Sequence, residues 1–206
     1  MICRQFSGAF LRRAALAVWL LSALAISGCA SFYVDTGTRD VVPAEMNKPA
    51  QPGPVQVLFE FQTKGTPNAR ATDHLRTQVM SEIQASGLFS SANDSPSPSG
   101  ALLSLKLNNV PLTDNAFGKG FVTGLTFGLA GSQVSDGYVC TVEYIGPQSG
   151  SPIVKTARHA IHTVIGAKGA PENAKKSESI DDAVRTMTRQ IVGTALKELS
   201  LDPNFR

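Results

Sequence analysis

The chain contains 206 residues, with 19 lysine and arginine residues against 16 aspartate and glutamate residues. Three of the basic residues, Arg4, Arg12 and Arg13, precede Cys29 and no acidic residue does, so the rest of the chain carries 16 basic and 16 acidic groups. A body without net charge argues against nucleic-acid binding, which depends on clustered lysine and arginine side chains that release counterions from phosphate.

An apolar run from Ala14 to Ile26 follows the arginine residues and ends at small side chains. The run is shorter than the roughly 20 apolar residues that cross a bilayer core. A basic start, a short apolar run and small residues at its end are typical of a secretory signal peptide. We therefore predict a cleaved signal in preference to a membrane-spanning helix.

The residues that end this run, Ile26-Ser27-Gly28-Cys29, resemble the lipobox of bacterial lipoproteins, although leucine is commoner at the first position. The resemblance implies that residues 1–28 are removed as a lipoprotein signal peptide. It also implies that the Cys29 thiol carries diacylglycerol and that the freed amine carries an acyl chain such as palmitate. Because Ala30, not aspartate, follows the cysteine, the resemblance implies attachment to the outer membrane of a Gram-negative bacterium, facing the periplasm.

Several acyl chains on one residue give a stable membrane anchor, since each buried CH₂ contributes about 0.8 kcal/mol and a single chain is marginal. The predicted partner of Cys29 is therefore the membrane itself. An ordinary signal peptide with an incidental Cys29 is the alternative.

Residues 29–54 comprise the lipidated cysteine and a stretch rich in proline and small polar residues without a sustained period, which predicts a flexible tether. A coil of this length reaches on the order of 25–30 Å, enough to lift a domain clear of lipid headgroups. Two apolar patches, Phe32-Tyr33-Val34 and Val41-Val42, leave open the alternative that the stretch docks on the folded body.

Residues 55–206 carry the patterns of a folded periplasmic domain. Apolar side chains alternate from Val55 to Phe61, which predicts a half-buried strand. Thr66-Pro67 offers an N-cap and a first helical residue, and an amphipathic helix follows until Gly87. A short strand over residues 87–92, a loop over 95–100 and a strand over 101–110 come next.

The C-terminal part predicts a hairpin and a second helix. Residues 137–146 and 151–166 have strand composition and flank a turn at 147–150, and Ser179 can cap a helix over residues 180–201. The order β-α-β-β-β-β-α predicts a single α+β domain, with two helices packed on one face of a largely antiparallel sheet. This layout resembles small lipoproteins that serve envelope assembly machines and the periplasmic domain of the lipoproteins that build the curli export channel.

The segment 116–137 is glycine-rich and apolar, and it is uncharged from Gly120 to Ser135. One apolar surface results whether it forms a helix or a strand, and glycine at every fourth position allows another backbone to approach closely. The segment could fold against its own domain, or it could meet the bilayer interface, a protein partner or copies of itself. The predicted contact surface comprises Gly120, Phe121, Gly124, Leu125, Phe127, Gly128 and Leu129.

No catalytic motif, cofactor site or metal site is predicted. Gly118-Lys119-Gly120 fails both the phosphate-loop and the dinucleotide-binding patterns. His159 and His162 have an odd spacing on a predicted strand, so they lie on opposite faces and cannot share one metal. Cys140 is the one cysteine left after Cys3 is removed and Cys29 is lipidated, and we expect a small buried apolar residue there, with an intermolecular bridge or a reactive thiol as the alternative.

These patterns predict a non-catalytic, membrane-anchored lipoprotein that acts as an accessory or scaffold for another envelope protein. Self-association into a membrane or channel-forming assembly through the glycine-rich segment is the first alternative. The second is a periplasmic hydrolase, which requires a polar pocket that joins an acid-base pair such as His159 with a carboxylate.

Overall fold

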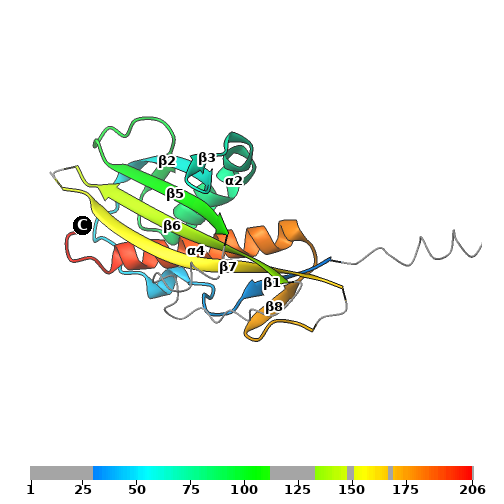
Figure 1. The fold of residues 1–206 in the computed structure, drawn as a ribbon. Coiled ribbons are helices and arrows are strands. Elements are labelled where there is room, and N and C mark those ends of the chain that lie inside the picture. Colours follow the sequence, from blue (N-terminus) through cyan, green and yellow to red (C-terminus); the bar gives the residue numbers. More distant parts are fainter. Residues whose placement is uncertain (1–29, 112–132, 148–150, 167–168, 206) are drawn as a thin grey trace, which may run out of the picture.

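The computed structural model describes residues 30–111, 133–147, 151–166 and 169–205 (Figure 1). Eight strands form one sheet in the order β3-β2-β5-β6-β7-β1-β8, with β4 paired to β2 at the side. In chain order the elements are β1 (Ala30–Asp35), the 3-10 turn η1 (Pro43–Glu45), β2 (Pro54–Thr63), β3 (Thr66–Pro67), α2 (Ala69–Ser86), β4 (Ser91–Asn93), β5 (Leu102–Pro111), β6 (Gln133–Ile145), β7 (Ile153–Ile165), β8 (Ala174–Ser177) and α4 (Ile180–Ser200).

The predicted fold class is confirmed: α2 and α4 cover one face of a largely antiparallel sheet (Figure 1). The strands β5, β6, β7, β1 and β8 form a continuous run of antiparallel pairs. The strand β2 pairs parallel with β5 and β4. Parallel neighbours need a crossover connection, and α2 provides it.

The core lies between the sheet and the two helices. Every second residue of the central strands points into it, including Leu103, Leu105 and Leu107 of β5, and Met187 and Ile191 of α4 pack from the other side. Cys140 of β6 is fully buried in this core, and burial raises the pKa of its thiol to about 12. The protonated thiol therefore behaves as the predicted small apolar residue.

Two of the three helix caps that the sequence predicts are confirmed. Ser179 accepts a hydrogen bond from the Asp182 N–H at 3.1 Å, and Gly87 ends α2 in the left-handed region at φ 68°. The predicted start of α2 at Thr66-Pro67 is wrong, because these residues pair with β2 as β3. Asn68 caps α2 instead, accepting from the Ala71 N–H at 3.1 Å.

Residues 30–54, which the sequence predicts to be a tether, lie on the body in the structure. β1 pairs with β7 on one side and β8 on the other, so its backbone groups are satisfied within the sheet. Tyr33, Val34 and Asp35 are buried, which agrees with the alternative that this patch docks on the domain. Composition favoured a tether because only a short run of strand-forming residues precedes the proline-rich part.

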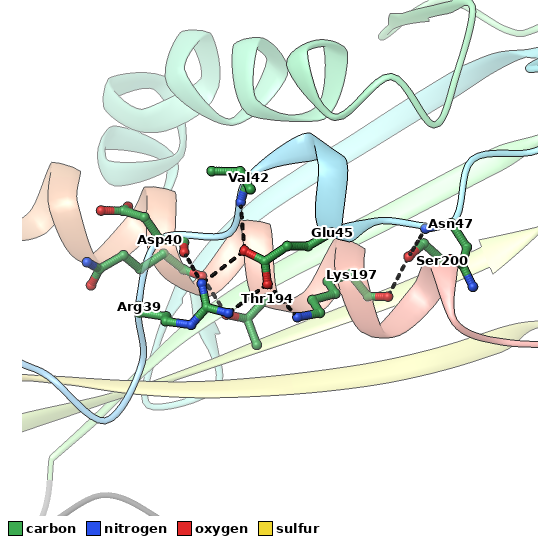
Figure 2. A network of polar contacts seen from close by, with 9 residues as sticks. Arg39, Asp40, Val42, Glu45, Asn47, Thr194, Lys197 and Ser200 are labelled. Atoms are coloured by element: carbon green, nitrogen blue, oxygen red, sulfur yellow. Dashed lines mark hydrogen bonds and ion pairs between the residues drawn. The ribbon is translucent and has the colours of Figure 1, made fainter.

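Residues 36–53, which we call the strap, cross the outer side of α4 (Figure 2). The crossing is necessary because β1 and β2 are separated in the sheet by β5, β6 and β7. A Cβ on Gly193 of α4 would lie 3.5 Å from Val41, and the Asn47 N–H donates to Ser200 Oγ at 3.1 Å. None of the helices in the described ranges is long and apolar enough to cross a membrane.

Candidate functional site

A polar pocket of about 370 Å³ opens between β8, the strap and the first half of α4. Its lining mixes positive and negative side chains with neutral donors and acceptors. The lining residues are Val34, Asp40, Lys175, Lys176, Ser177, Glu178, Asp182, Thr186, Arg189 and Gln190.

The carboxylate of Asp40 is paired with a side chain of α4 in this pocket. Arg189 donates to its two oxygens at 2.7 and 3.4 Å. The hydrogen bond from Arg189 lowers the pKa of Asp40, and a hydrogen bond from the Gln190 side chain lowers it further. Asp40 is therefore ionised and already paired, which suits it to positioning and does not suit it to accepting a proton.

A buried histidine lies behind Gln190. The Ala160 N–H donates to Nδ1 of His159 at 2.8 Å, so the ring carries its proton on Nε2, which donates to Gln190 Oε1 at 2.7 Å. Burial lowers the pKa of His159 and keeps the ring neutral. The hydrogen bond with His159 directs the amide oxygen of Gln190 toward the buried ring.

The arrangement supports binding better than acid-base chemistry. His159 is fully buried, and its ring hydrogen-bonds to an amide and not to a carboxylate. The pocket instead presents Lys175, Thr186 and the paired charges of Asp40 and Arg189 to a polar ligand. Among the described residues, no group of three histidine, cysteine, aspartate or glutamate side chains is arranged to hold a metal ion.

A second buried polar pair joins β1 to β7. His162 Nε2 lies 3.5 Å from Asp35 Oδ2, and neither side chain has exposed surface. His159 contacts Gln190 of α4, so it lies on the face of the sheet that the helices cover. His162 is paired with Tyr33 of β1 and lies on the other face, as the odd spacing of the two histidines predicts. The sequence analysis did not single out Asp35 as a buried polar residue. The feature that could have indicated it is its position directly after the apolar triplet Phe32-Tyr33-Val34.

The first described residue lies at one end of the sheet. Ala30 directly follows Cys29 and pairs with Ile165 at the end of β7. Cys29 itself and the predicted contact surface, Gly120, Phe121, Gly124, Leu125, Phe127, Gly128 and Leu129, lie outside the described residues. The residues that flank the latter segment, Pro111 and Gln133, belong to β5 and β6.

Comparison with known proteins gives no family for this chain. No protein-family model matches it, and no curated protein matches it. Among solved structures, a point variant of the PelC dodecamer from Paraburkholderia phytofirmans is similar, with 13% identity, 84% of this chain and 97% of that chain covered and a TM-score of 0.35. The PelC dodecamer from the same organism in another crystal form has 11% identity, 84% and 99% coverage and a TM-score of 0.34. At these TM-scores the likeness supports no conclusion about the function of this chain.

Proposed function

We propose that the protein is a lipid-anchored envelope lipoprotein whose folded domain is fixed directly to the outer membrane and serves as an accessory or scaffold for another envelope protein. The observation that carries the proposal is the start of β1 at Ala30, the residue after the predicted lipidation site. Cys29 would be the lipidated residue, and it has no spacer between it and the sheet.

An anchor without a spacer fixes the orientation of the domain. The strands β1, β5, β6 and β7 have one end each at the anchored edge, because Ala30 pairs with Ile165, Val164 pairs with Gln133 and Pro111 pairs with Asp136. Pro111 and Gln133, the described residues on either side of the uncharged segment, therefore belong to the strand ends on the same side of the sheet as Ala30. This position supports the prediction that the uncharged segment contacts an apolar environment.

A fixed orientation suits a scaffold because it presents one set of surfaces at a constant height above the membrane. The polar pocket lies on the helix side of the sheet, between β8 and α4. Its ionised and already paired groups, Asp40 and Arg189, can orient a polar segment of a partner. Because Asp40 is already paired with Arg189, it is not available as an acid-base partner for His159. These observations favour binding over hydrolysis.

The test uses the two cysteines of the mature chain as a matched pair. Cys29→Ser removes the predicted lipid site, and Cys140→Ser changes a buried thiol while keeping the anchor. Whole cells are cross-linked, envelopes are extracted in mild detergent and the co-purifying proteins are identified by mass spectrometry. We expect the wild type and Cys140→Ser to carry lipid and to capture the same partner, and Cys29→Ser to lose both.

Two outcomes would contradict the proposal. If Cys29→Ser stays in the membrane fraction, and its N-terminal peptide shows no loss of lipid mass relative to the wild type, the protein is not a lipoprotein. If cross-linking yields only a ladder of the protein itself, self-association is the better interpretation. In that case Gly124→Leu and Gly128→Leu should reduce the size of the assembly in detergent.

A further inference from the structure

We infer that two exposed isoleucines, Ile165 and Ile180, enter the lipid surface beside the anchor, so that the domain is seated in the bilayer interface at this end. The inference rests on the proposed lipidation of Cys29. It concerns a lipid contact made by the folded domain itself, in addition to the acyl chains.

Ile165 lies beside the anchor because of the strand register. Its pairing partner is Ala30, which is the first residue after Cys29. Consecutive Cα atoms are about 3.8 Å apart and paired antiparallel Cα atoms about 4.5–5.5 Å apart, so Ile165 lies within roughly 10 Å of the lipidated residue. Apolar groups at a membrane interface insert about 5–10 Å into the headgroup region, so a side chain this close to the lipidated residue can reach that region.

Ile180 reaches the same end from the helix layer. β8 runs toward the anchored end and finishes at Ser177, opposite Phe32, and α4 begins at Ile180 three residues later. The other end of α4 lies far from the anchor, because Asp202 beyond it pairs with Lys155 near the start of β7 at 2.7 Å. In Figure 1 the first turn of α4 lies toward the same end of the molecule as the start of β1 and the end of β7.

Both side chains are exposed on the surface. Ile165 is 49% exposed and Ile180 is 46% exposed. Single exposed apolar residues are common on protein surfaces, so exposure alone indicates nothing. What distinguishes these two is the combination of exposure with a position next to an acylated residue that no spacer separates from the sheet.

The charges around Ile180 indicate which lipid surface fits. Glu178, Asp181 and Asp182 flank it in sequence, Lys175 and Lys176 precede them, and Arg185 pairs with Asp181 at 2.7 Å. Because these charges balance, the surface has no net attraction to an anionic headgroup layer, and we expect contact with a zwitterionic one.

The chain offers matched control positions for a direct test. Val154 is 53% exposed on β7, about 36 Å along the strand from Ile165, and Leu201 is 49% exposed just after α4, about 31 Å from Ile180. The single tryptophan, Trp19, lies in the predicted signal peptide, so the mature chain has none. One introduced tryptophan therefore reports on one position.

Four lipidated variants, Ile165→Trp, Ile180→Trp, Val154→Trp and Leu201→Trp, are purified from membranes and reconstituted in phosphatidylcholine vesicles with and without brominated acyl chains. We expect brominated lipid to quench the tryptophan emission of Ile165→Trp and Ile180→Trp about twofold, with a blue shift in vesicles, and to leave the emission of Val154→Trp and Leu201→Trp unchanged.

The outcomes separate this inference from the function on which it rests. If mass spectrometry finds lipid on Cys29 and brominated lipid quenches none of the four variants, the lipid contact is overturned while the lipoprotein assignment stands. If all four are quenched equally, the domain has no fixed end at the membrane and the inference also fails. If Cys29 carries no lipid, the proposed function and this inference fail together.

Discussion

Three acidic side chains join residues 30–54 to the rest of the domain. Asp35 meets His162 of β7, Asp40 meets Arg189 of α4 and Glu45 meets Lys197 of α4. In each pair the acidic partner comes from the N-terminal segment. A segment that composition alone predicts to be a tether is therefore held by specific side chains, and each of them can be tested.

Asp35→Asn is expected to destabilise the fold by about 1–3 kcal/mol, because it changes a fully buried polar group that lies 3.5 Å from His162 Nε2, and a buried polar group without a matching partner is costly. Urea unfolding followed by circular dichroism measures the change. Asp94→Asn, at an exposed position, is the matched control and should leave the midpoint unchanged. An Asp35→Asn midpoint equal to that of the control would show that the pair contributes nothing to folding.

Glu45 predicts a pH dependence of stability. Hydrogen bonds from Arg39 and Lys197 lower the pKa of Glu45 from 4.5 to about 2 (Figure 2). Because the folded pKa lies below the unfolded one, this contribution is complete above pH 4.5 and is lost as the pH falls toward about 2. Glu45→Gln should therefore lower the urea midpoint at pH 6 and flatten its decline between pH 4.5 and 2. A decline as steep as in the wild type would contradict this assignment.

At the scale of elements, the strap lies across α4 and depends on a small residue beneath it. Gly193 is buried in the middle of the helix, where glycine costs helix stability relative to alanine. A Cβ at this position would meet Val41 at 3.5 Å, an ordinary van der Waals contact. One carbon therefore fits under the strap and a longer side chain does not.

Two substitutions at Gly193 test this contact. Gly193→Ala should stabilise the protein by up to about 1 kcal/mol, since it improves helix propensity without a clash. Gly193→Leu should destabilise it by about 1–3 kcal/mol, because the larger side chain displaces the strap. Thermal unfolding ranks the two variants against the wild type. Equal effects of alanine and leucine would mean that the strap does not pack here.

The sequence predicted the long elements better than the short ones. Alternation from Val55 to Phe61 and the apolar stripe of α4 depend on local periodicity, which one sequence displays. The strands β1, β3 and β8 are short and are stabilised by pairing with other strands, as Val34 of β1 pairs with Ile161, so their own composition carried little signal. The pocket was missed for a related reason, because Asp40 and Arg189 meet only in the fold.

At the scale of the whole molecule, the proposed lipid anchor continues directly into the sheet. Inserting a Gly/Ser spacer of about 20 residues between Cys29 and Ala30 would let the domain move about 25 Å from the anchor. We expect Ile165→Trp with this spacer to keep its lipid and its fold, and to lose the quenching of its tryptophan by brominated lipid. Retained quenching would show that the domain binds the membrane independently of a rigid anchor.

We propose that Cys29 is lipidated, and the residues directly after it form the strand β1 of the domain and not a tether. Hydrogen exchange of the lipidated protein in phosphatidylcholine nanodiscs, read by mass spectrometry on the peptide covering residues 30–35, tests it most directly. We predict protection of these amides comparable to that of β7, since β1 pairs with β7 and β8. Complete exchange at the earliest time point, with β7 still protected, would contradict it.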